Sequence, residues 1–180
     1  MQAISTVSQR LASLLLPIGI VLSTIAPPAQ AAEKLTFIIG PLNRSVTLEE
    51  LSKLVETGEA RGDLGTILKV AGQEPDEAGQ FLSRRFPFDL VTAYRLLTSP
   101  PGEALLEKLG TILAPRRSNM AGAEALRAAI LLSLSGDNEF SIMELLEKYP
   151  TDARINVDAL QSVGNEFGDV TNLLGAFSGN

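Results

Sequence analysis

The sequence predicts a mainly α-helical domain: a bundle of about six to seven helices with a short N-terminal β-hairpin. A third short strand near Ala153-Asn156 can join that hairpin. Three observations lead to this class. Apolar residues recur at helical spacing from residue 48 onward, two capping boxes (Thr47 with Glu50, Ser141 with Glu144) mark helix starts, and the clearest run of β-formers precedes residue 47.

The predicted hairpin lies before the first helix. Residues 34–39 read Lys-Leu-Thr-Phe-Ile-Ile, a run rich in residues that favour strands. Residues 40–43 have the composition of a turn, and residues 44–46 can run back beside the first strand. We therefore expect two antiparallel strands here.

Three helices are expected between residues 47 and 86. The first begins at the Thr47 capping box and ends at Gly58. We expect Asp63 to cap the second and Pro75 to open the third, because each residue type suits the start of a helix. Their apolar positions are Leu48, Leu51, Leu54 and Val55, then Leu64, Ile67, Leu68 and Ala71, then Ala78, Phe81, Leu82 and Phe86.

Two further helices follow Pro87, and Asp89 is placed to cap the first of them. Residues 99–102, Ser-Pro-Pro-Gly, separate the two, and Pro115 ends the second. Their apolar positions are Leu90, Tyr94 and Leu97, then Leu105, Leu106, Leu109, Ile112 and Leu113.

Residues 121–134 form the most apolar stretch after the N-terminus, with only Glu124, Arg127 and Ser133 polar. This helix is expected to be buried on most sides and to form the centre of the core. Because Arg127 is a cation in an apolar helix, its head group either reaches solvent or pairs with an acid, Glu124 or Glu103. Such structural pairing is favoured over ligand recognition.

The last predicted elements follow residue 140. Ser141 with Glu144 opens a helix that Pro150 ends. After the short strand, Asn156 is placed to cap a final helix. The remaining residues, 168–180, are rich in Gly and Asn and are expected to form a flexible tail.

The first 31 residues have the pattern of a secretory signal peptide. Residues 1–10 carry one cation and no acid, residues 11–25 are predominantly apolar, and Ala29-Gln30-Ala31 supplies small residues for cleavage before Ala32. The alternative is a retained anchor, but a spanning helix needs roughly 20 apolar residues. We expect residues 1–31 to be the signal, residues 32–167 the helical domain, and the product to be exported to the periplasm or the cell exterior.

Composition excludes several classes of chemistry. The 180 residues include neither His nor Cys, which rules out a histidine-containing triad, a thiol nucleophile, a disulfide and a zinc–thiolate or iron–sulfur site. No nucleophile elbow or phosphate-binding loop is present. We therefore predict no catalytic residue, no cofactor and no metal. The formal charge of −6 and the absence of Trp argue against nucleic acid as a partner.

Two carboxylate pairs remain as candidates for catalysis. Glu103 and Glu107, and likewise Glu144 and Glu147, share one face of a predicted helix. A buried pair whose pKa values differ could act as acid and base. A solvated helix surface is the simpler interpretation.

Five arginines are candidate contacts for a ligand or a partner: Arg84, Arg85, Arg116, Arg117 and Arg127. An apolar groove between helices that is rimmed by either arginine pair would suit an anionic amphiphile. Tyr94 and Tyr149 are interpreted as core aromatics whose hydroxyls reach the surface.

The order of several short motifs carries a family resemblance. The motifs are Gly40-Pro41-Leu42, Arg85-Phe86, Ser99-Pro100-Pro101-Gly102-Glu103-Ala104-Leu105-Leu106, Leu109-Gly110, Ala125-Leu126-Arg127-Ala128-Ala129-Ile130 and Lys148-Tyr149-Pro150. Over residues 33–167 the chain resembles the cyanobacterial domain of unknown function found N-terminal to predicted secreted α/β-hydrolases. The resemblance implies a preceding signal peptide and a following hydrolase domain with nucleophile, acid and histidine. Here the domain is expected to stand alone, and no catalytic residue carries over to it.

From the sequence we expect an exported, non-catalytic helical accessory module that acts on a partner hydrolase or on an amphiphilic, lipid-like envelope ligand. One alternative is a histidine-free hydrolase or lyase that uses carboxylates. A second is a structural envelope protein held in the membrane by an uncleaved N-terminus. A third is an α/β-hydrolase by family association alone.

Overall fold

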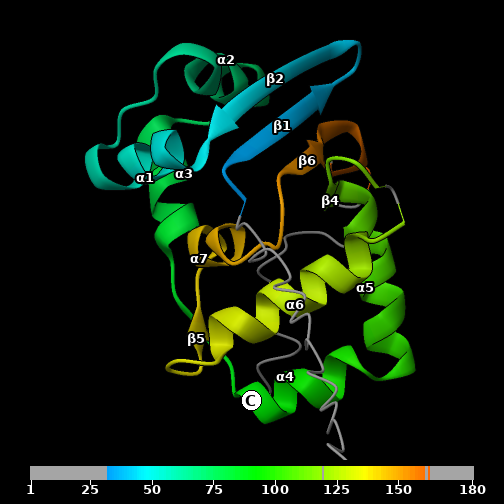
Figure 1. The fold of residues 1–180 in the computed structure, drawn as a ribbon. Helices are drawn as coiled ribbons and strands as arrows, with labels where there is room; N and C mark the ends of the chain where they lie inside the picture. The colour runs from blue at the N-terminus through cyan, green and yellow to red at the C-terminus, as the bar shows by residue number, and fades with distance from the viewer. Residues whose placement is uncertain (1–31, 119, 161, 163–180) are drawn as a thin grey trace, which may run out of the picture.

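The computed structural model describes residues 32–118, 120–160 and 162 (Figure 1). The predicted signal peptide and the predicted tail lie outside the described residues. In chain order the elements are β1 (Lys34–Ile39), β2 (Leu42–Thr47), α1 (Leu48–Thr57), α2 (Gly62–Ala71), α3 (Pro75–Ser83), β3 (Phe86–Pro87), α4 (Leu90–Leu97), α5 (Pro100–Ile112), β4 (Leu113–Pro115), α6 (Gly122–Leu134), β5 (Glu139–Phe140), α7 (Ile142–Glu147) and β6 (Ala153–Asn156).

The mainly helical class is confirmed, but the sheet is larger than a hairpin with one added strand. β1 pairs antiparallel with β2 as predicted, and it also pairs in parallel with β6. β4 adds an antiparallel edge, so the strand order is β2-β1-β6-β4. β3 and β5 form a second, two-stranded sheet. The prediction missed β3, β4 and β5 because strands of two or three residues are too short to show an alternating pattern.

Several predicted caps are present. The Thr47 hydroxyl accepts the Glu50 N–H at 3.2 Å, and the Glu50 carboxylate accepts the Thr47 N–H at 2.8 Å, which completes the capping box of α1. Asp89 caps α4, Ser141 caps α7, and Ser99 caps α5 at the predicted boundary.

The predicted final helix also has its cap. The Asn156 side-chain oxygen accepts the Ala159 N–H at 3.1 Å, and residues 157–160 and 162 are helical. This helix therefore begins directly after β6.

The prediction that Asp63 caps α2 is wrong. The helix begins at Gly62, one residue earlier, and Arg61 precedes it without a side-chain cap. Asp63 therefore lies in the first turn, where its carboxylate is 3.6 Å from the Arg44 guanidinium of β2. This ion pair links α2 to the edge of the sheet.

The inward face of α3 is narrower than predicted. Ala78 and Leu82 pack against the core, whereas Phe81 is 48% exposed. Phe86 lies beyond the helix in β3, where its ring centroid is 5.6 Å from that of Phe140. It belongs to a small second cluster and not to the face of α3.

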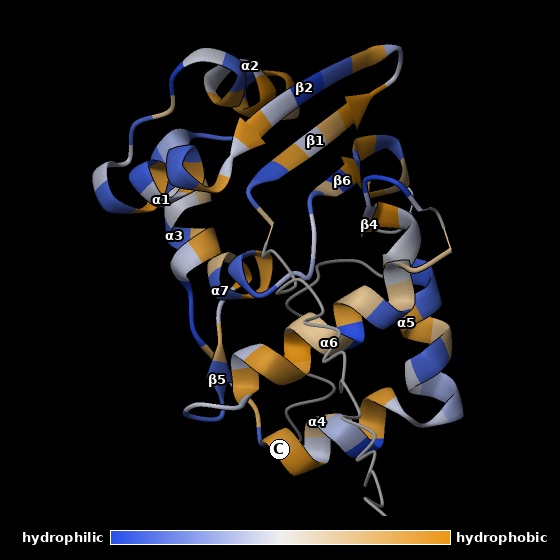
Figure 2. Ribbon diagram, viewed as in Figure 1, coloured by the Kyte–Doolittle hydropathy of each residue, from blue (hydrophilic) through white to orange (hydrophobic). Residues whose placement is uncertain are grey.

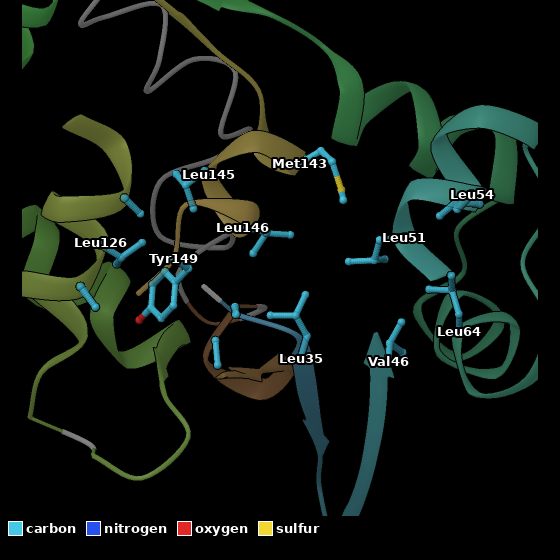
Figure 3. Close-up of a cluster of buried hydrophobic side chains, with 14 of the residues drawn as sticks. Leu35, Val46, Leu51, Leu54, Leu64, Leu126, Met143, Leu145, Leu146 and Tyr149 are labelled. Atoms are coloured by element: carbon cyan, nitrogen blue, oxygen red, sulfur yellow. The ribbon is translucent and has the colours of Figure 1, made fainter. Parts of the chain in front are cut away.

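The main core lies between the sheet and helices α1, α2, α6 and α7 (Figure 3). The strands contribute Leu35 and Val46, and Tyr149 follows α7 and is fully buried. Figure 2 shows how strongly apolar residues dominate α6. This helix contacts α4, α5, α7, β4 and β5, so its predicted place at the centre is confirmed, although Ala128 and Leu132 leave one stripe exposed.

Helices α5 and α6 approach almost backbone to backbone. A Cβ atom on Gly122 would lie 2.5 Å from the Gly110 carbonyl oxygen and 2.7 Å from the Gly110 Cα. Only glycine fits at such a separation. This contact fixes the helix that carries Arg127 against the helix that carries Glu103.

Candidate functional site

Arg127 lies on α6 where the end of α4 meets the start of α5. Its Nε donates to the Leu97 carbonyl at 3.2 Å, and its Nη2 lies 3.5 Å from Glu103 Oε1. Of the two acids predicted, Glu103 is therefore the partner. A cation at the C-terminal carbonyls of α4 and an acid in the first turn of α5 both suit the helix dipoles. Arg127 thus joins three helices through one guanidinium.

Arg84 and Arg85 lie beside the small β3–β5 sheet. Arg85 Nη1 is 2.7 Å from an Asp137 carboxylate oxygen and 3.4 Å from Glu139 Oε2. The Glu139 N–H and then Arg85 hold the pKa of Asp137 below its ordinary value. The Arg84 guanidinium lies 5.5 Å from the centre of the Phe86 ring, a cation–π contact. Two carboxylates therefore share the charge of Arg85.

Arg116 and Arg117 are exposed in the turn after β4. The Arg116 N–H donates to the Asp152 carbonyl at 2.8 Å. This pair precedes the start of α6, whereas Arg85 bonds to Asp137, which follows the end of α6. Figure 1 shows that α6 runs from α5 to β5. At 1.5 Å per residue α6 is about 20 Å long. The structure therefore separates the two arginine pairs, so each is a candidate rim by itself.

None of the four candidate carboxylates is buried. Glu103 and Glu107 are exposed on α5, Glu147 is exposed on α7, and Glu144 is half-buried. A catalytic acid–base pair depends on burial to separate two pKa values. In the described part of the chain, no group of three or more Asp or Glu side chains is placed to hold a metal ion.

Two hydroxyls lie beside carboxylates, as in a nucleophile–base pair. Thr47 stands at a junction of strand and helix, and its hydroxyl donates to Glu50 Oε2 at 2.9 Å. Its φ of −84° and ψ of 155° are ordinary extended values, unlike the strained elbow of an α/β-hydrolase nucleophile. The Thr92 hydroxyl donates to Asp89 at 2.8 Å in the same way. Both pairs cap the N-terminus of a helix, α1 and α4 respectively.

The two tyrosines differ in position. Tyr149 is buried as predicted, but its hydroxyl is directed inward, toward the Leu113 carbonyl 3.4 Å away. Burial raises the pKa of Tyr149, which keeps the phenol neutral. Tyr94 is 57% exposed, so the prediction that it is a core residue is wrong. Leu97 is buried as predicted, but the helix buries Ala93 in place of its neighbour Tyr94.

The outward face of α4 consists of Val91, Tyr94, Arg95 and Thr98, all exposed and at helical spacing. Val91 is 55% exposed. Tyrosine and arginine are enriched where proteins bind other proteins. This face is therefore a candidate contact surface, and of its residues the sequence interpretation named only Tyr94, which it assigned to the core.

Asp152 is a residue that the sequence analysis did not single out, although it connects distant parts of the chain. One of its carboxylate oxygens accepts the N–H groups of Glu33 at 3.1 Å and Lys34 at 3.0 Å. The preceding Ala32 N–H donates to the Tyr149 carbonyl at 3.0 Å. An Asp in a turn is a common acceptor of backbone N–H groups. The partners of Asp152, however, lie more than a hundred residues away in the sequence, so no local pattern can show them.

These features define a mainly α-helical domain with a four-stranded mixed sheet and several separate charged clusters. A family model described as "Alpha/beta hydrolase of unknown function (DUF1400)" matches residues 31–158. The chain belongs to this family. The comparison with curated proteins found no match, and the comparison with solved structures found none either. Among the described residues, the helices are too short or too polar to cross a membrane.

Proposed function

We propose that this chain is an exported, non-catalytic accessory module that binds a hydrolase. The observation that carries the proposal is a mismatch between family and composition. The family is described as α/β-hydrolases, yet the 180 residues contain no histidine and no cysteine. Because α/β-hydrolase chemistry uses a nucleophile, an acid and a histidine, a separate domain has to supply the catalytic set.

The placement of the polar groups supports this proposal. The candidate carboxylates are not buried, Glu103 pairs with Arg127, and the Thr47 hydroxyl closes the start of a helix. In the relatives that we envisage, from cyanobacteria, the hydrolase domain follows this one in the same polypeptide. This domain recognises a hydrolase of that kind.

The outward face of α4 is our candidate for the hydrolase contact. Val91 and Tyr94 offer adjacent apolar area, and Arg95 offers a cation beside them. Exposed Tyr and Arg are the residue types that dominate binding energy at interfaces. Arg84, Arg116 and Arg117 are further exposed cations that add contacts for an acidic partner.

The amphiphilic ligand receives less support than the hydrolase. A groove for an anionic head group needs uncompensated cations around one apolar cavity. The charge of Arg85 is compensated by Asp137 and Glu139, which leaves Arg116 and Arg117 as the pair that could meet an anionic head group. We therefore place the hydrolase first.

Export is part of the proposal. It rests on the signal-peptide pattern of residues 1–31, with small residues ahead of Ala32. After cleavage the domain would act in the periplasm or outside the cell. A core of this size needs no disulfide in an oxidising compartment.

The test is capture of the partner together with its activity. Tagged chain 32–180 is incubated with the native envelope fraction, and bound proteins are labelled with a fluorophosphonate that reacts with active serine hydrolases. We expect a labelled hydrolase, identified by mass spectrometry, whose ester turnover changes when purified chain is added. Recovery of lipid alone, or of no labelled protein, would contradict the proposal.

Matched variants test the surface. The double variant Val91→Gln and Tyr94→Gln changes the outward face of α4, whereas Val70→Gln with Phe81→Gln changes residues of similar exposure on α2 and α3. We expect the first to reduce capture at least tenfold, equivalent to about 1.4 kcal/mol. Equal capture by both variants would show that the outward face of α4 does not contact the hydrolase.

A further inference from the structure

The first three described residues are held by a distant part of the chain. Ala32 is 4% exposed, and its N–H donates to the Tyr149 carbonyl at 3.0 Å. The N–H groups of Glu33 and Lys34 both donate to one oxygen of Asp152, at 3.1 and 3.0 Å. The backbone of residues 32–34 is therefore fixed on the connection between α7 and β6.

This fixed segment begins at the residue that follows the expected cleavage site. Hydrolysis of the peptide bond before Ala32 consumes one water and leaves a carboxylate on Ala31 and an amine on Ala32. The amine takes up a proton at neutral pH, since an α-amino group has a pKa of about 7.7 to 8.0. Cleavage thus converts a buried amide N–H into a buried cation.

We propose that the new α-ammonium group of Ala32 occupies a built binding site, with the Tyr149 carbonyl as its hydrogen-bond acceptor and the Asp152 carboxylate as its counter-charge. An ammonium group has three protons, so it keeps the bond to Tyr149 with donors to spare. The proposal rests on the export part of the proposed function and is independent of hydrolase binding.

The separation of the two charges follows from backbone geometry. Consecutive backbone nitrogens are at most about 3.7 Å apart, so the Ala32 nitrogen lies within about 7 Å of the Asp152 oxygen that Glu33 contacts. That separation is shorter than the Debye length of about 8 Å at physiological salt. Burial of Ala32 disfavours a charged amine and also strengthens its attraction to a nearby carboxylate, so the buried ammonium depends on Asp152 as its counter-charge.

The site has a consequence for processing. A peptidase binds its substrate as extended, accessible backbone, whereas residues 32–34 are engaged by Tyr149 and Asp152. Cleavage therefore takes place before this contact closes, and afterwards the anchored amine protects the first residues from further trimming. Signal removal and completion of the sheet become successive steps, because Lys34 begins β1.

The test is a thermodynamic cycle that compares the stability of four forms of chain 32–180. One pair has a free amine on Ala32 and the other a chemically acetylated amine, and each pair contains the unchanged chain and the variant Asp152→Asn. Acetylation removes the charge but keeps the N–H for Tyr149. The substituted side chain keeps an oxygen that accepts from Glu33 and Lys34 but has no charge.

We expect acetylation to lower the thermal midpoint of the unchanged chain by at least about 2 °C more than that of the Asp152→Asn variant. Equal effects of acetylation in both backgrounds would overturn the proposal. The intact mass of the exported protein is measured separately: a chain that begins at Ala32 supports the proposal, and one that begins elsewhere overturns it. Capture of a hydrolase is a separate measurement on the same protein, and neither result above changes what it is expected to show. The two proposals can therefore fail independently.

Discussion

The sheet end and the helical end of this domain are held together in different ways. At the sheet end, β1 pairs with β6, so that Leu35 lies opposite Ala153, more than a hundred residues away. At the helical end, α4, α5 and α6 follow one another closely in the chain and meet through the Gly110–Gly122 contact and the Arg127 bonds. One end can therefore form from local contacts, whereas the other closes only when the two ends of the domain meet.

The same contrast separates the two candidate functional surfaces. The helical end carries the outward face of α4, which is exposed and independent of chain closure. The sheet end carries the contacts of residues 32–34 with Tyr149 and Asp152, which depend on that closure. We therefore expect partner binding and N-terminal anchoring to respond to different substitutions.

The largest effect is expected at the sheet end from Leu35→Ala. Leu35 is fully buried at the centre of the main core, so truncation removes its contacts and leaves a cavity. We expect a loss of about 4 kcal/mol in the free energy of unfolding, measured by urea denaturation. The control is Leu42→Ala on the same hairpin, where the side chain is 55% exposed and little should change. A small effect of both would show that the sheet does not anchor the core.

Next comes Gly122→Ala at the helical end. The added Cβ meets backbone atoms of Gly110, which cannot move without separating α5 from α6. We expect a loss of about 3 kcal/mol, with hydrogen exchange accelerated in α5 and α6 before β1 and β6. Gly136→Ala is the matched control, because open space surrounds that position. If hydrogen exchange accelerated equally throughout the domain, the two ends would not be stabilised separately.

Arg127→Met tests whether the bonds of Arg127 hold the helices of the helical end together. The substitution keeps much of the side-chain volume but removes the bond to the Leu97 carbonyl and the pair with Glu103. We expect a loss of about 1.5 kcal/mol, most of it from the carbonyl bond, because Glu103 is too exposed to contribute much. Arg117→Met, in an exposed turn, should have almost no effect. Equal losses would mean that Arg127 does not join the helices.

The smallest effect concerns the small β3–β5 sheet. The pKa of Asp137 is lowered first by the Glu139 N–H and then by Arg85, so the ionised form stabilises the folded state. This contribution is present above the ordinary carboxyl pKa and disappears as the pH falls through the lowered value. In an NMR titration, Arg85→Gln should raise the midpoint of Asp137 part of the way toward normal. A midpoint unchanged by the substitution would contradict the role of Arg85.

The sequence predicted the helices better than the sheet, for a physical reason. The caps at Thr47, Asp89 and Ser141 act within three residues, so they are visible in the chain. The β4 strand at Leu113 exists only because β6 lies beside it, and the isolated pattern there is that of a helical stripe. The spacing of Tyr94 also suits a core face, but the smaller Ala93 allows the closer approach of helices.

The candidate site could be predicted only in part. The rule that a cation in an apolar helix needs an acid or solvent left Glu124 and Glu103 open as partners of Arg127, and the structure shows Glu103. The separation of the two arginine pairs and the role of Asp152 depend on contacts between distant segments. No pattern within a single helix or strand contains that information.

We propose above all that this chain carries no hydrolase chemistry of its own and that a partner supplies it. The most direct measurement is to treat purified chain 32–180 with a labelled fluorophosphonate and a panel of chromogenic esters, alone and after addition of the captured hydrolase. We predict that the chain alone gives no labelled residue and no turnover above the buffer rate, and that all label falls on the partner. Label on a serine or threonine of this chain, with ester turnover lost on substitution of that residue, would contradict the account.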